Sequence, residues 1–190
     1  MRTIVYLHGF VSSPQSRKAM MLGDYLRQCV TGIDYVVPRL HHRPKQALVQ
    51  VEAACRGIAA AELTLIGSSL GGFYATVAAE RLGCRAALLN PAVHPQRHFM
   101  RYLGPHRNLY TGEEFELTMA HVEELHALDP PAITRFERYW LFVETGDEVL
   151  DYRDAVAYYA GATQEVVRGG DHTLTSFPER IPDIVAWAQS

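Results

Sequence analysis

Residues 63–79 read LTLIGSSLGGFYATVAA, a mostly apolar run followed by a turn rich in glycine and serine and then by a helix-forming stretch. A short apolar run that ends at turn residues is typical of a buried strand, and the residues after Gly72 favour a helix. The sequence therefore predicts a strand that turns sharply into a helix at Ser69. Gly67 and Gly71, two positions on either side of Ser69, would let neighbouring backbone pass close to this turn.

A serine held on such a turn is a candidate nucleophile. The turn places Ser69 at a helix N-terminus, where free N–H groups and the helix dipole favour developing negative charge. Ser68 is the alternative. It lies out of register with Gly67 and Gly71, so the spacing favours Ser69.

Similar apolar runs recur along the chain and predict six strands, at Thr3–His8, Asp34–Arg39, Leu63–Ser68, Ala86–Asn90, Tyr139–Thr145 and Gln164–Arg168. Longer stretches between them predict helices, at Ser16–Cys29, Lys45–Ala60, Gly71–Leu82, Tyr152–Ala160 and Phe177–Ala188. Right-handed crossovers would join these elements into a mostly parallel sheet. We therefore expect an α/β fold with helices on both faces and a binding crevice at the carboxyl ends of the strands.

One stretch interrupts this alternation. Between Pro91 and Pro131 the sequence contains several prolines, five histidines and no good strand. Long insertions in compact domains are frequently lids over a binding pocket, and the alternative is a surface excursion. We expect a single domain over residues 1–190 with a small cap inserted at residues 92–132.

Length and composition narrow the class of protein. The 190 residues are 48% hydrophobic, and the formal net charge of -3 is not gathered into long runs of one sign. This composition predicts one compact core and a small-molecule partner, with no nucleic-acid or membrane surface. No apolar run is long enough for a signal-peptide core or a membrane span, so we expect a cytoplasmic protein. The three cysteines form no CxxC pair and predict neither a disulfide framework nor a thiolate metal site.

A serine nucleophile needs a base of near-neutral pKa, which histidine supplies. Nine histidines compete for this role. His172 lies in the loop at residues 168–173, after the last predicted strand, where folds of this kind place the base. The other histidines, including His41 and His42, lack the spacing of a helical ligand pair with a carboxylate, so no metal is expected.

The histidine in turn needs a carboxylate that holds one tautomer and stabilises its positive charge. Asp147 directly follows an apolar strand and a glycine, so it would emerge at the same sheet edge as Ser69. Four other acidic residues compete with it: Glu144, Glu148, Asp151 and Asp171. Glu144 lies within the strand, and Glu148 and Asp151 lie farther round the loop. The position therefore favours Asp147, with Asp151 next.

Acyl transfer also needs two backbone donors for the oxyanion. The N–H of Leu70, directly after the nucleophile, would supply one of them. The N–H of Phe10, which follows His8 and Gly9 at the end of the first strand, would supply the other.

The segment after this loop, residues 12–18, combines serines with two basic residues. It could cradle a phosphate or a coenzyme A head group. The simpler interpretation is that the serines cap the following helix while Arg17 and Lys18 lie on its solvated face, and we expect this arrangement.

Together these residues resemble the α/β-hydrolase superfamily and, in detail, the small bacterial YqiA-like esterases. The matching blocks span nearly the whole chain and include HGF at 8–10, GSSLGGFYA at 67–75, LNPA at 89–92, TGDEVLDY at 145–152 and GGDH at 169–172. The resemblance implies a minimal hydrolase fold of about six mostly parallel strands. It also implies hydrolysis of carboxylic esters or acyl thioesters, including acyl-coenzyme A.

We therefore expect a serine esterase or thioesterase. His172, oriented by Asp147, would take the proton of Ser69 as Ser69 attacks the acyl carbonyl, and the Leu70 and Phe10 amides would hold the oxyanion. Water would then hydrolyse the acyl-enzyme, and no cofactor is needed. One alternative is an acyltransferase or another hydrolase that uses the same triad. The other is a hydrolase fold without activity that serves as a binding module.

Overall fold

The computed structural model describes residues 1–108 and 110–190, and within them a six-stranded sheet forms the centre of the molecule. The strand order is β2-β1-β3-β4-β7-β8, and every neighbouring pair is parallel. The strands are β1 (Arg2–Leu7), β2 (Ile33–Val36), β3 (Leu63–Ser68), β4 (Arg85–Leu89), β7 (Tyr139–Glu144) and β8 (Thr163–Val167). Each overlaps one of the six predicted ranges, so the predicted α/β fold with a parallel sheet is confirmed.

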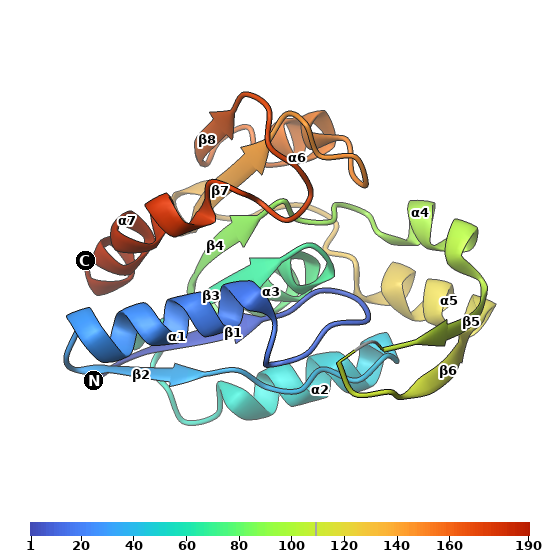
Figure 1. Ribbon diagram of the computed structural model, residues 1–190, viewed down its shortest axis with the longest axis horizontal. Helices are drawn as coiled ribbons and strands as arrows, with labels where there is room; N and C mark the ends of the chain where they lie inside the picture. Colours follow the sequence, from blue (N-terminus) through green and yellow to red (C-terminus); the bar gives the residue numbers. More distant parts are fainter. Residues whose placement is uncertain (109) are drawn as a thin grey trace.

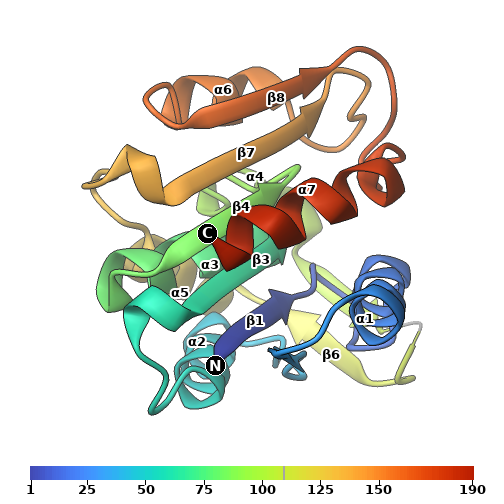
Figure 2. The same cartoon turned by 90° about the vertical axis from the view of Figure 1, so that its left-hand side faces the viewer.

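Helices cover both faces of this sheet (Figures 1 and 2). On one face lie α1 (Arg17–Cys29) and α7 (Phe177–Gln189); on the other lie α2 (Pro44–Ala54), α3 (Leu70–Leu82) and α6 (Tyr152–Tyr158). All five predicted helices are present. The second ends six residues earlier than expected, because the chain turns after Ala54 and reaches Gly57 with a φ of 80°.

Helices cover both faces of the sheet, which explains why its inner strands, β1, β3, β4 and β7, are nearly continuous apolar runs. Along β1, Ile4 and Tyr6 pack with α1 and α7, whereas Val5 and Leu7 pack with the helices of the opposite face. Because successive side chains point to opposite faces, both sets must be apolar when both faces are covered. No helix in the described part of the chain has the length and apolar composition needed to cross a membrane.

The segment between β4 and β7 forms a small substructure. Its elements are α4 (Gln96–Phe99), β5 (Gly104–Arg107), β6 (Glu114–Leu117) and α5 (Met119–Leu128), and β5 pairs with β6 as an antiparallel hairpin. The expectation of a segment without strands was wrong. These strands have only four residues and pair only with each other, so they lack the apolar run of a covered strand. In Figure 1 the substructure lies at the end of the molecule opposite both termini.

Short 3₁₀ turns occur in three connections of the described chain, at η1 (Ala60–Glu62), η2 (Met100–Tyr102) and η3 (Phe136–Arg138). The turns η1 and η3 lead directly into β3 and β7, respectively, at the edge where these strands begin. They therefore lie away from the carboxyl ends of the strands, where Ser69 follows β3.

The turn between β3 and α3 requires very close backbone packing. A Cβ atom on Gly71 would lie 2.0 Å from the carbonyl oxygen of Leu7, and one on Gly67 would lie 2.3 Å from the carbonyl oxygen of Gly71. Ser69 itself adopts a φ of 56°, a left-handed conformation that side chains rarely take. The predicted sharp turn, with glycines on either side of Ser69, is confirmed.

This packing predicts a large loss of stability for Gly71→Ala, because the new methyl group would collide with rigid backbone of β1. We expect the free energy of unfolding to fall by about 3 kcal/mol, as for other overpacked sites. The matched control is Gly57→Ala, where the methyl group would meet no atom within 4 Å; its left-handed backbone should cost only about 1 kcal/mol. Urea denaturation of the two variants would measure the difference, and equal midpoints would contradict the steric argument.

Candidate active site

Ser69 opens onto a cavity of about 680 Å³ at the carboxyl ends of the strands. The cavity walls are mostly apolar, and they include Phe10 from the loop after β1, Phe99 from α4, Leu150 from the loop after β7 and Phe177 from α7. Elements that are far apart in the sequence therefore enclose the serine. This is the arrangement expected of a small-molecule pocket in a parallel α/β fold.

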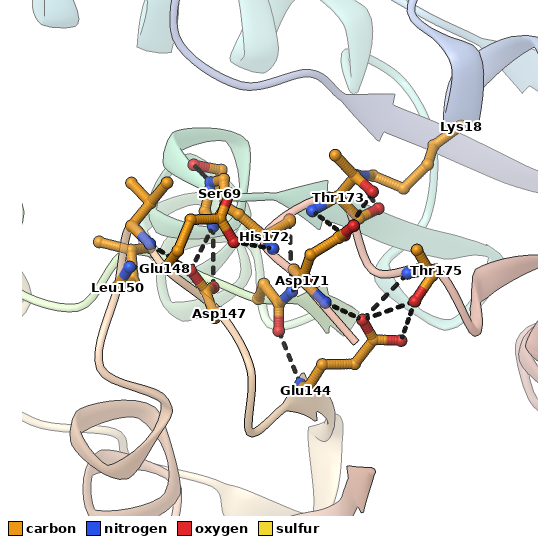
Figure 3. A network of polar contacts seen from close by, with 12 residues as sticks. Lys18, Ser69, Glu144, Asp147, Glu148, Leu150, Asp171, His172, Thr173 and Thr175 are labelled. Carbon is orange, nitrogen blue, oxygen red and sulfur yellow. Dashed lines mark hydrogen bonds and ion pairs between the residues drawn. The ribbon is translucent and has the colours of Figure 1, made fainter. Parts of the chain in front are cut away.

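A chain of hydrogen bonds joins three side chains at this edge (Figure 3). The Ser69 Oγ lies 2.9 Å from the His172 Nε2, and the His172 Nδ1 lies 2.8 and 2.9 Å from the two carboxylate oxygens of Asp147. The His172 side chain is 19% exposed, whereas that of Asp147 is only 2% exposed. This geometry lets His172 take a proton from Ser69 while Asp147 fixes the tautomer of the ring.

Asp147 is fixed by the loop that follows it. Its Oδ1 accepts hydrogen bonds from the backbone N–H groups of Val149 at 2.9 Å and Leu150 at 2.8 Å. Burial alone would raise the pKa of Asp147, but the hydrogen bonds from His172 and from these two N–H groups hold this pKa below its usual value. The carboxylate is therefore ionised at neutral pH and can stabilise a protonated His172.

The competing acidic residues have other partners. Glu148 accepts a hydrogen bond from the backbone N–H of His172 and does not contact the ring. Asp151 caps the N-terminus of α6, and Asp171 accepts hydrogen bonds from the residue two positions farther along its own loop. Of the acidic residues considered, the structure places only Asp147 against the imidazole.

Glu144 lies within a strand, as predicted, but it also contacts the histidine loop, which was not predicted. Glu144 is 1% exposed, and its carboxylate accepts hydrogen bonds from the backbone N–H groups of Asp171 at 2.8 Å, Thr175 at 3.0 Å and Ser176 at 2.7 Å. Burial would raise the pKa of Glu144, but these hydrogen bonds lower it below its usual value. The signal in the sequence was a glutamate that ends an otherwise apolar strand, because a buried carboxylate needs several donors.

Asn90 supports the same loop from the neighbouring strand. It follows β4 with a φ of 41°, and its Nδ2 donates to the carbonyl oxygens of Asp171 at 2.9 Å and His172 at 3.3 Å. Its Oδ1 accepts from the backbone N–H of Glu144 at 3.0 Å. Asn90 therefore ties the ends of β4 and β7 to the segment that carries His172.

Two backbone donors lie beside Ser69 with no acceptor among the described residues: the N–H groups of Phe10 and Leu70. The loop that presents Phe10 is held by His8, whose Nε2 accepts from the N–H of Leu40 at 3.1 Å and whose Nδ1 lies 3.0 Å from the carbonyl oxygen of Gly9. Burial lowers the pKa of His8, so its ring is neutral and suits these two contacts. The two free N–H groups are available to an oxyanion.

The segment predicted as a cap contributes directly to the cavity. His98, Phe99 and Tyr102 line it from α4 and η2. The ring of Phe10 packs edge-on against Phe99, with the ring centroids 5.2 Å apart, and against Phe115 of β6 at 5.9 Å. The loop with the Phe10 donor is thus packed against this substructure.

One cluster outside the cavity offers metal-ligating atoms. Side chains of His41, His42 and Glu113 bring such atoms within 4.8 Å of one another. However, the Nδ1 of His41 already accepts from the backbone N–H of Arg43, and the Nδ1 of His42 lies 3.0 Å from the Nε2 of His121. The Nδ1 of His121 accepts a hydrogen bond from a backbone N–H, so the hydrogen of this ring is on Nε2. This Nε2 therefore donates to the Nδ1 of His42. The Nε2 atoms of His41 and His42 therefore carry the ring hydrogens. An N–H group can donate to a carboxylate, whereas a metal ion needs a nitrogen without a hydrogen.

The first turn of α1 differs from its expected arrangement. Ser16 is the N-cap residue, but its side chain makes no capping hydrogen bond. Lys18 does not lie on a solvated face: it lines the cavity, and its Nζ donates to the carbonyl oxygen of Thr173 at 2.7 Å (Figure 3). Arg17 is exposed, as expected, but the expectation for Ser16 and Lys18 was wrong. The helix α1 begins at the rim of the cavity, so the Lys18 side chain reaches the histidine loop.

The contacts of Glu144 predict a pH-dependent effect of Glu144→Gln. The folded-state pKa is lowered, so the carboxylate stabilises the fold above its unfolded pKa of about 4.3, and this contribution is lost as the pH falls through the folded value. We expect Glu144→Gln to lower the free energy of unfolding by about 3 kcal/mol near neutral pH, and the difference from wild type to shrink below about pH 4. Urea denaturation across this range would test it, with Glu148→Gln as an exposed control. A difference that does not change with pH would contradict the assignment.

Comparison with solved structures shows the same fold in several proteins. The mouse α/β hydrolase domain-containing protein 10 matches with a TM-score of 0.75 and 14% identity, over 98% of this chain and 89% of that chain. Est1E from Butyrivibrio proteoclasticus matches with a TM-score of 0.70 and 14% identity, over 99% and 88%. The esterase domain of a Rhodothermus marinus protein matches with a TM-score of 0.67 and 18% identity, over 99% and 86%. At these identities the likeness establishes the fold.

The family comparison covers almost the entire sequence. Residues 3–189 match the family described as "Uncharacterised protein family (UPF0227)". The match includes β1, the turn at Ser69 and the histidine loop, so it contains every element that lines the candidate site. The chain belongs to the UPF0227 family, whose fold here is that of the α/β-hydrolase superfamily.

Proposed function

We propose that this protein is a serine hydrolase that cleaves carboxylic esters or acyl thioesters, with acyl-coenzyme A among the candidate thioesters. The observation that carries the proposal is the hydrogen-bonded chain from Asp147 through His172 to Ser69, which opens onto an apolar cavity. Two free N–H groups beside the serine add the oxyanion donors that acyl transfer needs. A buried serine with only a structural role would need neither the cavity nor these donors.

The first half of the reaction forms an acyl-enzyme. The Ser69 hydroxyl transfers its proton to the His172 Nε2 as its Oγ attacks the acyl carbonyl carbon. The Phe10 and Leu70 N–H groups stabilise the negative charge that develops on the carbonyl oxygen. The tetrahedral intermediate then collapses, and His172 gives its proton to the departing alcohol or thiol.

The second half regenerates the enzyme. His172 removes a proton from a water molecule, whose oxygen attacks the acyl group on Ser69. Collapse of this second intermediate releases the carboxylic acid, and Ser69 recovers its proton from His172. Asp147 stabilises the positive charge of His172 in both halves, and the chemistry proceeds without a cofactor.

The dimensions and walls of the cavity suit a small acyl compound. A volume of about 680 Å³ lies within the usual range for small-molecule sites. Aromatic and aliphatic side chains around Ser69 would take an acyl chain out of water, which is favourable in proportion to the apolar area that it buries. We therefore propose a small-molecule ester or thioester as the partner of this site.

The same groups could transfer the acyl chain to an acceptor other than water. Adding alcohols or amines to the assay distinguishes an acyltransferase, because the acyl product then changes from the free acid to a new ester or amide. A binding module without activity is distinguished by a fluorophosphonate probe, since only an activated serine reacts rapidly.

The proposal predicts that Ser69→Ala abolishes turnover of p-nitrophenyl esters from acetate to long acyl chains. We expect kcat/KM to fall by a factor of about ten thousand or more, with the fold retained. Ser68→Ala is the matched control, because Ser68 is adjacent to Ser69 but forms no hydrogen bond with His172 among the described residues. The Ser68→Ala protein should therefore keep its turnover and its reaction with the probe. Turnover retained by Ser69→Ala would disprove the nucleophile assignment.

The role of Asp147 predicts a comparable loss for Asp147→Asn. An amide at this position can donate as well as accept, so it no longer fixes the productive tautomer of His172, and we expect kcat to fall by a factor of about a thousand or more. Asp151→Asn tests the carboxylate that was the second candidate for the partner of the histidine. It should change kcat by less than about threefold, because Asp151 caps α6 and pairs with Arg153. A larger loss in Asp151→Asn than in Asp147→Asn would reverse the assignment.

A further inference from the structure

The cavity that contains Ser69 has a basic corner at the first turn of α1. Arg17 and Lys18 both line the cavity there, next to Ser16. Of the described residues that line it, none is an aspartate or a glutamate. The chain as a whole carries a net charge of -3, so this local excess of positive charge is a property of the cavity and does not reflect the overall composition.

Neither basic side chain has a carboxylate partner in the described part of the chain. Lys18 is half-buried, its Nζ donates to the neutral carbonyl oxygen of Thr173, and no carboxylate oxygen of the described residues lies within ion-pair distance of it. Arg17 is exposed at the rim and forms no ion pair with any described residue. Both side chains can therefore turn donors toward a ligand without breaking an ion pair.

Ser16 supplies an independent indication that this corner lacks an acceptor. Its Oγ is shielded from solvent and has no hydrogen-bond partner among the described residues, although a hydroxyl at an N-cap usually accepts a backbone N–H. The first N–H groups of this 13-residue helix thus have no side-chain cap. An anion in the cavity would complement the helix N-terminus and the two basic side chains together.

We propose that the corner formed by Ser16, Arg17 and Lys18 binds a negatively charged group of the substrate. The preferred esters would carry a carboxylate or a phosphate at a distance from the scissile bond. This inference rests on the proposed hydrolase function, and it adds the charge of the substrate to it. Both anions accept several charge-assisted hydrogen bonds, which is the chemistry that the corner offers.

The charge of Lys18 depends on pH. Burial lowers the pKa of Lys18 to about 8, although the carboxylates of Asp171, Glu144 and Asp147 act in the opposite direction. These carboxylates already accept hydrogen bonds from the histidine loop and its surroundings. Lys18 is therefore charged at neutral pH and loses its charge in mildly alkaline solution, whereas Arg17 stays charged.

The test uses pairs of esters that differ only in charge. In the first pair the charge is on the leaving group: para-carboxyphenyl butanoate is anionic, and para-carbamoylphenyl butanoate is its neutral counterpart. In the second pair the charge is on the acyl chain: the mono-para-nitrophenyl ester of octanedioic acid is anionic, and the compound with a terminal amide in place of the free carboxylate is neutral. The quantity measured is the ratio of kcat/KM for the anionic ester to that for the neutral ester. Intrinsic reactivity and the titration of the triad cancel when this ratio is compared between variants or between pH values.

In at least one pair, we expect this ratio to fall about tenfold in Lys18→Met, which removes a half-buried charge. We expect it to fall about threefold in Arg17→Gln, which removes an exposed charge. The pair that responds identifies the side of the scissile bond that carries the charge. Arg56→Gln is the control, since Arg56 is an exposed residue between α2 and β3, at the edge where β3 begins. In wild type the ratio should also decline as the pH rises through about 8, with a smaller decline in Lys18→Met. Ratios that are equal in all four proteins would overturn the inference.

A binding measurement separates this inference from the proposed function. Calorimetric titration of Ser69→Ala protein with both members of each pair reports on the corner whether or not wild-type protein hydrolyses these esters. Tighter binding of an anionic ester, lost when Lys18→Met is added, supports the corner as an anion site. Equal binding of the anionic and neutral esters in both pairs rejects it. Absence of wild-type turnover together with preferential binding would reject only the hydrolase proposal.

Discussion

The close contact between the β3–α3 turn and β1 is the constraint on which the rest of the site depends. Gly71 has no room for a methyl group because the carbonyl oxygen of Leu7 occupies that space. Ser69 follows this contact in a left-handed conformation, and the loop after β1, with its Phe10 N–H, lies beside the serine. The proposed nucleophile and the proposed oxyanion donors thus lie on either side of one close packing contact, and no flexible element is needed to bring them together.

The histidine reaches Ser69 by a different route. Its loop contains two glycines with positive φ, Gly169 and Gly170, and has no regular structure of its own that could fix its position. Two buried polar side chains fix its position. Glu144 accepts hydrogen bonds from N–H groups of the loop, and Asn90 donates hydrogen bonds to its carbonyl oxygens. A buried carboxylate is unfavourable unless fully hydrogen-bonded, so Glu144 strongly favours the one loop conformation that satisfies it.

The sequence predicted the four inner strands well because a strand covered on both faces must be almost entirely apolar, which separates it clearly from its surroundings. It also identified Ser69, His172 and Asp147, which the structure brings within hydrogen-bond distance, because each follows a predicted strand at the same edge. The hairpin of β5 and β6 was missed because four-residue strands that pair only with each other carry no such pattern. The contacts of Glu144 and Lys18 depend on how distant loops meet, which local periodicity does not encode.

Burial acts on the two sides of this cavity with opposite results. Asp147 loses contact with water but receives donors from His172 and two backbone groups, so it keeps its charge. Lys18 is only partly removed from water and donates to a single carbonyl oxygen, and burial lowers its pKa to about 8. The triad is therefore electrostatically complete in the free protein, whereas the basic corner is not. A group that is costly to keep charged in the free protein gains the most from an opposite charge brought by a ligand. This asymmetry separates the residues proposed to perform the chemistry from those proposed to select the substrate.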